Sequence, residues 1–149
     1  DQSSSRGLGD VYKRQQNISD ALSLLGITRI DHGVRCVEDD DLMEQLIAKR
    51  TPLTVCPLSN TKLKVFETMQ QHNIVKLLRK GLCVTINSDD PAYFGGYMND
   101  NFLAVANAHP LTKNELAQFS INAIEASFVS PQARQELTAQ VHQYLTVNA

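Results

Sequence analysis

Three short apolar segments of this chain each end in polar residues, and each is followed by residues with helical periodicity. The segments predict strands over residues 28–32, 52–57 and 82–88. Strands that alternate with helices form a parallel sheet, and the carboxyl ends of its strands lie at one edge. The sequence therefore predicts an α/β fold whose polar strand ends gather where such folds place their chemistry.

Helices are expected on either side of these strands. Residues 38–41 form an acidic cluster ahead of an amphipathic stretch over 42–47, where acids in the first turn complement the helix dipole. This capping role is favoured over a metal-binding role, because no other ligand-like residue is nearby. Further helices are predicted from residue 17 or 19 to 25 and over residues 72–80, 99–108, 112–128 and 130–145, with residues 62–68 as an irregular or short helical loop.

The composition limits the function classes. With 149 residues, 42% hydrophobic content and 20% charge, the chain can form one globular domain. Its net charge of −2 gives no electrostatic basis for binding nucleic acid or a membrane surface, and no apolar stretch approaches the roughly 20 residues that span a bilayer. Cys36, Cys56 and Cys83 are widely spaced in apolar surroundings, and the N-terminus lacks the apolar core of a secretory signal. These features predict a cytoplasmic protein with reduced cysteines rather than a disulfide framework or a paired-cysteine zinc site.

Two adjacent carboxylates, Asp89 and Asp90, end the third predicted strand. A carboxylate pair at the end of a buried strand is costly without a cation or a hydrogen-bonding ligand, so the pair is a candidate site. An ordinary turn is the alternative, because Asp, Pro and Gly are common turn residues. His32, which follows the first predicted strand, is either a functional residue or a strand-end residue that bonds to backbone. The remaining histidines lack paired ligand spacing and are expected on the surface or in packing: His72, His109 and His142.

Three strand-end motifs resemble those of a known family. Residues 29–33 (RIDHG), 56–60 (CPLSN) and 88–91 (SDDP) are similar to the last three strand-end motifs of the adenosine/adenine deaminases. Residues 90–97 (DPAYFGGY) are most similar to the adenine deaminase branch. Because a complete barrel takes about 250 residues, the resemblance implies the C-terminal portion of a (β/α)8 TIM barrel, with about three strand–helix units plus terminal helices.

The resemblance also implies a reaction, the zinc-dependent hydrolytic deamination of adenine to hypoxanthine and ammonia. By this resemblance Asp89 is a zinc ligand, and His32 is the catalytic residue that contacts the zinc-bound water. Asp90 matches the residue that binds the purine ring nitrogen N7, for which one of the two partners must be protonated. Ser59 and Asn60 would stiffen the loop near His32, with a plain turn role as the alternative.

Two parts of the family's zinc site are missing from the sequence, the His-x-His motif of the first strand and the His-x-x-Glu motif of the fifth. The chain as given is therefore expected to be inactive and to need the missing N-terminal half of the same chain as its partner. Three alternatives remain open: adenosine deaminase, a non-catalytic half-barrel that binds a purine or a partner, and another metal hydrolase on the same barrel. The aromatic residues Tyr93 and Phe94 near the rim suit free adenine better than its nucleoside.

The first 15 residues do not fit the rest of the chain. They are rich in Ser, Gly and charge, and they show neither helical nor strand periodicity. Residues 1–15 are therefore predicted to be non-native, adapter-like sequence or a disordered tail, and residues 16–149 to be the C-terminal part of a deaminase barrel domain.

Overall fold

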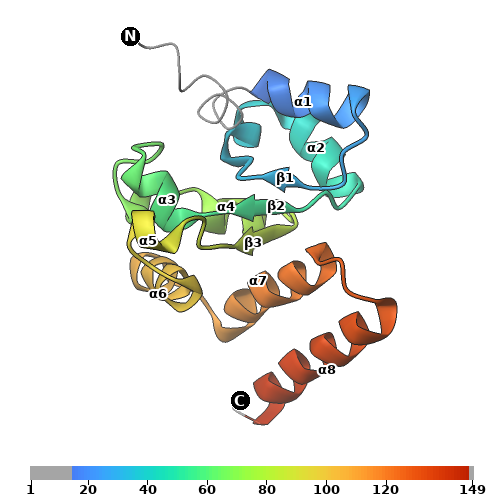
Figure 1. Cartoon of the computed structure of the whole chain (residues 1–149), viewed down its shortest axis with the longest axis vertical. Coiled ribbons are helices and arrows are strands. Elements are labelled where there is room, and N and C mark those ends of the chain that lie inside the picture. Colours follow the sequence, from blue (N-terminus) through green and yellow to red (C-terminus); the bar gives the residue numbers. More distant parts are fainter. Residues whose placement is uncertain (1–14, 148–149) are drawn as a thin grey trace.

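The computed structural model describes residues 15–147 and contains one parallel sheet in that range. Its strands are β1 (Ile30–Asp31), β2 (Leu53–Val55) and β3 (Val84–Ile86), hydrogen-bonded in the order β1-β2-β3 (Figure 1). In the register of the sheet Leu53 lies between Ile30 and Val84. The predicted parallel α/β arrangement is confirmed. The proposed tail lies outside the described residues except for Gln15, which begins the first helix.

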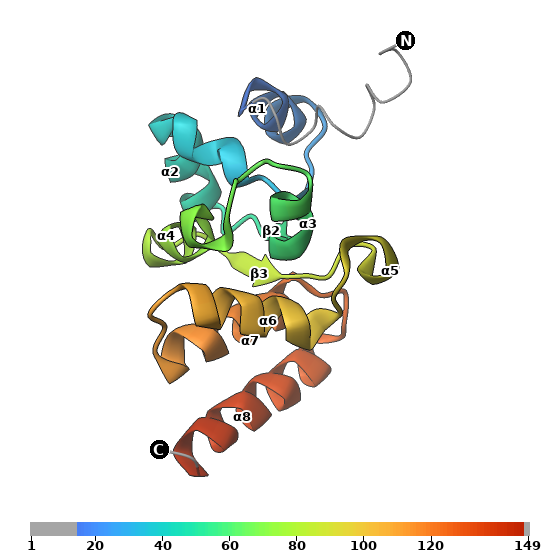
Figure 2. The same ribbon diagram turned by 90° about the vertical axis from the view of Figure 1, so that its left-hand side faces the viewer.

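Helices connect the strands and follow the last of them. The helix α1 (Gln15–Leu24) precedes β1, and α6 (Met98–Ala108) and α7 (Lys113–Ala126) lie between the sheet and α8 (Pro131–Val147) in both ribbon views (Figures 1 and 2). The predicted helices are confirmed in order, with small shifts of their ends. The remaining elements are η1 (Val34–Glu38), α2 (Asp40–Ala48), α3 (Pro57–Lys62), η2 (Met69–Gln71), α4 (Ile74–Arg79) and α5 (Pro91–Phe94).

The core lies between the sheet and the helices that cover it. All three residues of β3 are buried, as expected for a strand of a parallel sheet that is covered on both faces. Leu46 of α2, Leu77 of α4 and Phe119 of α7 reach this core with no exposed surface. None of the described helices is both long enough and apolar enough to cross a membrane. The packing therefore fixes the strands, and the strands fix where their carboxyl ends lie.

Side-chain caps start two of the helices. The Asp39 carboxylate accepts a hydrogen bond from the backbone N–H of Leu42 at 3.0 Å, which confirms the capping role of the acidic cluster. At the start of α7 the predicted capping box is present, because Glu115 N–H donates to Thr112 Oγ1 at 3.2 Å and Thr112 N–H donates to Glu115 Oε2 at 2.9 Å. The ends of these helices are therefore encoded locally.

The structure corrects two sequence-based boundaries near the site. Residues 57–62 form the helix α3 rather than a strand end and loop, because Pro57 takes the first helical position, where its fixed φ fits. The helix α4 begins at Ile74, two residues later than predicted, because the His72 ring accepts the Ile74 backbone N–H at 3.1 Å. Both corrections bring polar side chains toward the carboxyl ends of the strands.

Candidate active site

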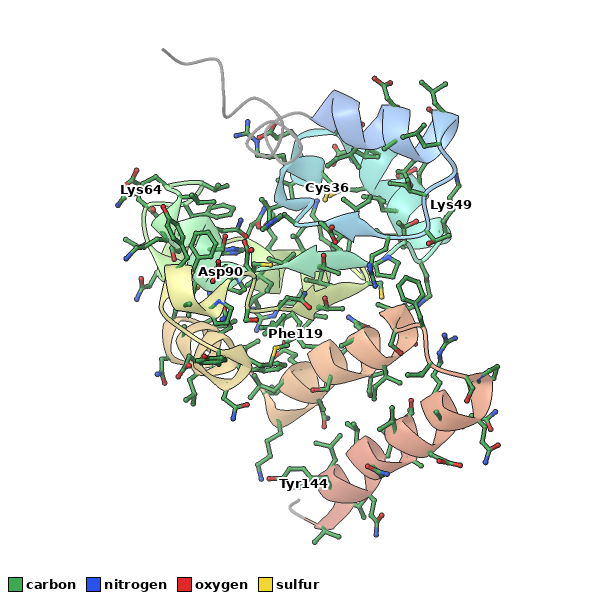
Figure 3. The ribbon with its side chains drawn as sticks, in the orientation of Figure 1. Cys36, Lys49, Lys64, Asp90, Phe119 and Tyr144 are labelled. Atoms are coloured by element: carbon green, nitrogen blue, oxygen red, sulfur yellow. The ribbon has the colours of Figure 1, made fainter. Side chains whose placement is uncertain are left out.

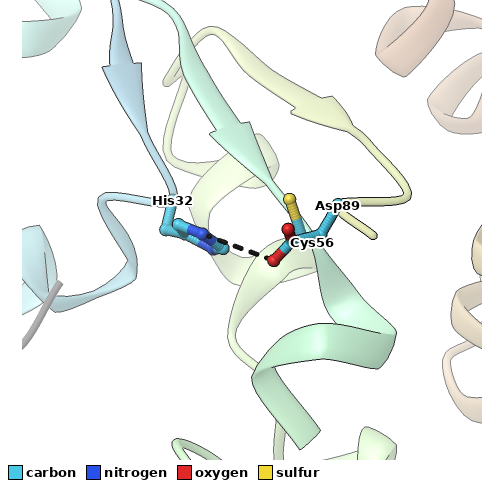
Figure 4. A group of neighbouring side chains, drawn as sticks. All are labelled: His32, Cys56 and Asp89. Atoms are coloured by element: carbon cyan, nitrogen blue, oxygen red, sulfur yellow. Dashed lines mark ion pairs between the residues drawn. The ribbon is translucent and has the colours of Figure 1, made fainter. Parts of the chain in front are cut away.

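The carboxyl ends of the three strands bring His32, Cys56 and Asp89 together. One ligand atom from each residue lies within 4.8 Å of the others, although the three residues are spread over the chain (Figure 4). His32 Nε2 and Asp89 Oδ2 are 3.9 Å apart, although a whole strand separates the two positions along the sheet. The predicted convergence of polar strand ends is therefore confirmed for His32 and Asp89.

Two of these residues have an unusual backbone. His32 has φ 60° and Asp89 has φ 58°, both in the left-handed region that residues with a Cβ seldom occupy. Gly33, next to His32, has φ 70°, and a Cβ there would lie 2.8 Å from a methyl group of Leu53. Non-glycine residues that the surrounding structure holds in the left-handed backbone conformation are common at functional sites. The chain therefore accepts local strain at the two residues whose side chains meet.

Burial lowers the pKa of His32, although the nearby charges of Asp89 and Asp31 act in the opposite direction. The imidazole is therefore neutral at neutral pH, in the form that binds metals or exchanges hydrogen bonds with a bound oxygen. Asn60 Nδ2 lies 3.3 Å from His32 Nδ1 and holds that side of the ring.

The Asp89 carboxylate is held by the neighbouring helix. Ser59 Oγ donates to Asp89 Oδ2 at 2.7 Å, and Ser59 and Asn60 are both fully buried in the first turns of α3. The structure places both side chains next to the site residues, within a helix rather than a turn. Because α3 supplies both hydrogen bonds, it fixes the two site residues relative to each other.

Cys56 was missed by sequence reasoning as a member of this cluster. Its thiol donates weakly to the Thr54 carbonyl at 3.6 Å. Burial, together with the charges of Asp89 and Asp31, raises the pKa of Cys56 to about 12, so the group stays a thiol. Its place in the motif CPLSN, directly after a strand, was the available signal.

Asp90 lies beside the cluster rather than within it. Its Oδ1 accepts the backbone N–H of Tyr93 at 3.0 Å, which caps the short helix α5, and the residue is exposed. Tyr93 is 69% exposed and packs edge-on against Phe94 with ring centroids 4.9 Å apart. The predicted aromatic pair therefore lies next to Asp90. The Asp89 carboxylate faces His32 and the Asp90 carboxylate caps α5, although both residues are exposed.

Comparison with known proteins identifies the family. Residues 9–144 match the model of the family described as adenosine deaminase. The chain belongs to that family. It is 62% identical over 130 residues to an adenine deaminase of Vibrio parahaemolyticus, which covers 87% of this chain and 39% of the relative. An adenine deaminase of Hahella chejuensis is 58% identical over 125 residues, 84% of this chain and 37% of its own length.

Solved structures show the same fold. The crystal structure of adenine deaminase from Arthrobacter aurescens superimposes with a TM-score of 0.86 at 41% identity, covering 89% of this chain and 40% of that one. A zinc-bound amidohydrolase from Burkholderia ambifaria, at 22% identity and a TM-score of 0.81, shares the fold. The predicted partial TIM barrel is therefore confirmed. The chain spans about two fifths of the length of the curated relatives it matches.

The described residues fit part of a metal site. The deaminase family is metal-dependent, and an imidazole nitrogen and a carboxylate oxygen are donors that zinc accepts. The Asp89 carboxylate is oriented by a buried hydroxyl, which is the arrangement expected around a metal ligand. Asp89 alone, or even Asp89 and His32 counted together, falls short of the four-coordinate shell of zinc, so the remaining ligands have to come from other residues.

Proposed function

We propose that the chain is part of a zinc-dependent adenine deaminase, which hydrolyses adenine to hypoxanthine and ammonia. The observation that carries the proposal is the meeting of His32 and Asp89 at the carboxyl ends of the strands, in a chain with relatives at 58% and 62% identity that are adenine deaminases. The strand-end position is where TIM-barrel enzymes assemble their active sites.

In this proposal Asp89 is a zinc ligand. Zinc held there would lower the pKa of a water molecule and so make hydroxide available near neutral pH. Ser59 contributes by holding Asp89 Oδ2 through its hydroxyl, which limits the rotation of the carboxylate before any ligand binds. The strained backbone at Asp89 further restricts where the carboxylate points.

His32 is proposed as the catalytic residue that acts on the attacking oxygen. Its ring is neutral and lies 3.9 Å from Asp89 Oδ2, so a water oxygen held near Asp89 would be within reach of Nε2. A hydrogen bond there orients the water and stabilises the charge that develops as C6 of adenine is attacked.

Asp90 is proposed to bind the substrate at the purine ring nitrogen N7. Its carboxylate is fixed by the Tyr93 N–H at the start of α5, which gives a defined direction for a second hydrogen bond. That bond requires a proton on the carboxyl group or on the ring nitrogen. The neighbouring aromatic pair, Tyr93 and Phe94, would contact the edge of a small free base.

The remaining parts of the site are proposed to come from an upstream part of the same protein. Residues 16–149 would then be the C-terminal part of the barrel domain, and residues 1–15 would be non-native sequence. The proposed location is the cytoplasm, because Cys36, Cys56 and Cys83 are all buried and free.

The test begins with the genomic DNA immediately upstream of the codon for Gln16. A continuous reading frame that encodes His-x-His and then His-x-x-Glu supports the proposal, and the extended protein should release ammonia from adenine faster than from adenosine. Asp89→Ala in that protein should abolish both zinc binding and turnover. A stop codon at that position would contradict the proposal. Faster release of ammonia from adenosine than from adenine would show that adenosine, not adenine, is the substrate.

A further inference from the structure

We propose that His72 is a positioning residue that acts through Asn60 to keep the proton of the His32 ring on Nε2, so that His32 enters the site as a hydrogen-bond donor. This inference rests on the proposed function for what the donor is used for. The three side chains form a continuous series, His72–Asn60–His32, that runs from the start of α4 through α3 to the end of β1.

A backbone amide determines which atom donates and which accepts in each hydrogen bond of the series. The N–H of Ile74 donates to His72 Nδ1 at 3.1 Å, and a backbone amide nitrogen cannot accept, so His72 Nδ1 carries no proton. His72 is 2% exposed and its ring packs 4.3 Å from that of Phe66. Burial lowers its pKa to about 3, so the ring is neutral and its one proton is on Nε2.

That proton determines the orientation of Asn60. His72 Nε2 lies 3.1 Å from Asn60 Oδ1, and because this ring nitrogen donates, the amide atom that faces it has to be oxygen. The amide nitrogen then faces the other way, toward His32 Nδ1 at 3.3 Å. The orientation of the amide therefore follows from the backbone of Ile74 rather than from the amide itself. Asn60 is fully buried, so water cannot substitute for either partner.

The same reasoning fixes the proton of His32. The Asn60 amide nitrogen donates, so His32 Nδ1 accepts and the neutral ring carries its proton on Nε2. Nε2 is the nitrogen that faces Asp89 Oδ2 at 3.9 Å. A general base at this position would need a lone pair on Nε2, which only the other tautomer has. His32 is therefore built to donate to an oxygen between itself and Asp89.

A packing role for His72 is the alternative that the sequence favoured. A packing residue contributes volume and burial, and its replacement by an apolar residue would leave the proton of His32 where it was. If His72 is a positioning residue, its replacement by an apolar residue changes which nitrogen of His32 carries the proton. The location of the His32 proton therefore separates the two roles, and it can be measured without zinc or turnover.

The decisive measurement is long-range proton–nitrogen NMR on this chain with nitrogen-15 in its histidine rings. At about pH 8, His32 and His72 should each show a protonated Nε2 and an unprotonated Nδ1. A proton on His32 Nδ1, or equal populations of the two tautomers, would overturn the proposal. This result stands apart from the proposed function, because a chain with no deaminase activity in any extended form would still give the same spectrum.

Variants test the direction of the series. Asn60→Asp replaces the donor by oxygen, so the population of His32 with an unprotonated Nδ1 should fall on the order of tenfold, the equivalent of one hydrogen bond. His72→Leu should lower the same population by removing the group that orients Asn60, and His72→Gln should restore it because its amide can donate to Asn60. His142→Gln, on the exposed face of α8, is the control. Unchanged His32 tautomers in Asn60→Asp would contradict the proposal, and if the variants fail to fold the spectrum of the unchanged chain decides.

Discussion

The strand ends and the C-terminal helices are built in different ways. At the strand ends, each polar side chain is held by a neighbour, as Ser59 holds Asp89 and Asn60 holds His32. The helix α8 has no buried residue and packs against α7 across an apolar groove of about 940 Å³, at the far side of α7 from the sheet (Figures 2 and 3). Tyr144 in this groove is 70% exposed. Specific hydrogen bonds therefore fix the site, whereas the packing of α8 on α7 leaves the side chains of α8 at least partly exposed.

The largest effect should come from the element between these two regions. Phe119 of α7 is fully buried, and its ring packs edge-on against Phe102 at 6.5 Å, so Phe119→Ala should lower the free energy of unfolding by about 3–5 kcal/mol. Leu137→Ala in α8, where the side chain is 38% exposed, should cost less than about 1 kcal/mol. Urea unfolding followed by circular dichroism measures both. Equal losses would show that α8 is as firmly packed as α7.

Acidification should destabilise the site and spare α8. Burial, with a smaller contribution from the charge of His109, lowers the pKa of His72 from 6.5 to about 3. In the unfolded chain His72 takes up a proton near pH 6.5, and in the folded chain it does not. The stability of the folded chain that depends on a neutral His72 is therefore complete above pH 6.5 and is lost as the pH falls toward 3. Between about pH 7 and pH 4.5 the loss due to His72 should be about 2 kcal/mol.

Urea titrations at the two pH values give the measurement. His72→Gln should remove most of this part of the pH dependence, since the replacement does not titrate. His142→Gln, in exposed α8, should leave it unchanged. A pH dependence that is equal in all three proteins would mean that burial does not suppress the charge of His72.

A smaller effect is expected when a serine hydroxyl is removed, and it should be seen at the strand ends but not at α8. Ser59→Ala removes the hydrogen bond to Asp89 Oδ2, and the loss of such support around a metal ligand should weaken zinc binding by the complete protein about tenfold. The control is Ser130→Ala, which removes the bond from Ala133 N–H that caps α8 and should leave zinc affinity unchanged. Competition with a chromogenic chelator measures both affinities. Equal affinities in the two variants would mean that the backbone alone orients Asp89.

Much of the fold was predictable because its signals are local. The capping box at Thr112 and the acids ahead of α2 are read from neighbouring residues, and the structure confirms both. The alternation of apolar strands and helices predicted the parallel sheet, because strands that are joined through helices pair in parallel. The meeting of His32 and Asp89 followed from the same topology.

The positioning of His72 was not predictable in the same way. Its partner Asn60 is 12 residues away, and the contact exists because residues 57–62 became helical and turned Asn60 toward the core. No periodicity in the sequence marks this contact. Cys56 was missed for a related reason, since its apolar neighbours are typical of a packing cysteine while its thiol points toward the site. Side-chain direction at a strand end depends on the backbone there, and the left-handed residues could not be foreseen.

The smallest effect should come from Cys56, although its sulfur lies within 4.8 Å of ligand atoms of His32 and Asp89. A cysteine binds zinc as a thiolate. Without a metal the raised pKa of about 12 keeps Cys56 a thiol, and its S–H is directed to the Thr54 carbonyl at 3.6 Å, so zinc would have to displace both the proton and this hydrogen bond. Cys56→Ala should therefore change the zinc affinity of the complete protein by less than about twofold, while Asp89→Ala should abolish binding. A cobalt-substituted protein adds a spectroscopic readout, because a thiolate ligand gives a charge-transfer band that the unchanged protein should lack. A charge-transfer band that is present in the unchanged protein and absent from Cys56→Ala would show that Cys56 is a metal ligand. Each of the three strand ends would then hold a residue of the site in a fixed position.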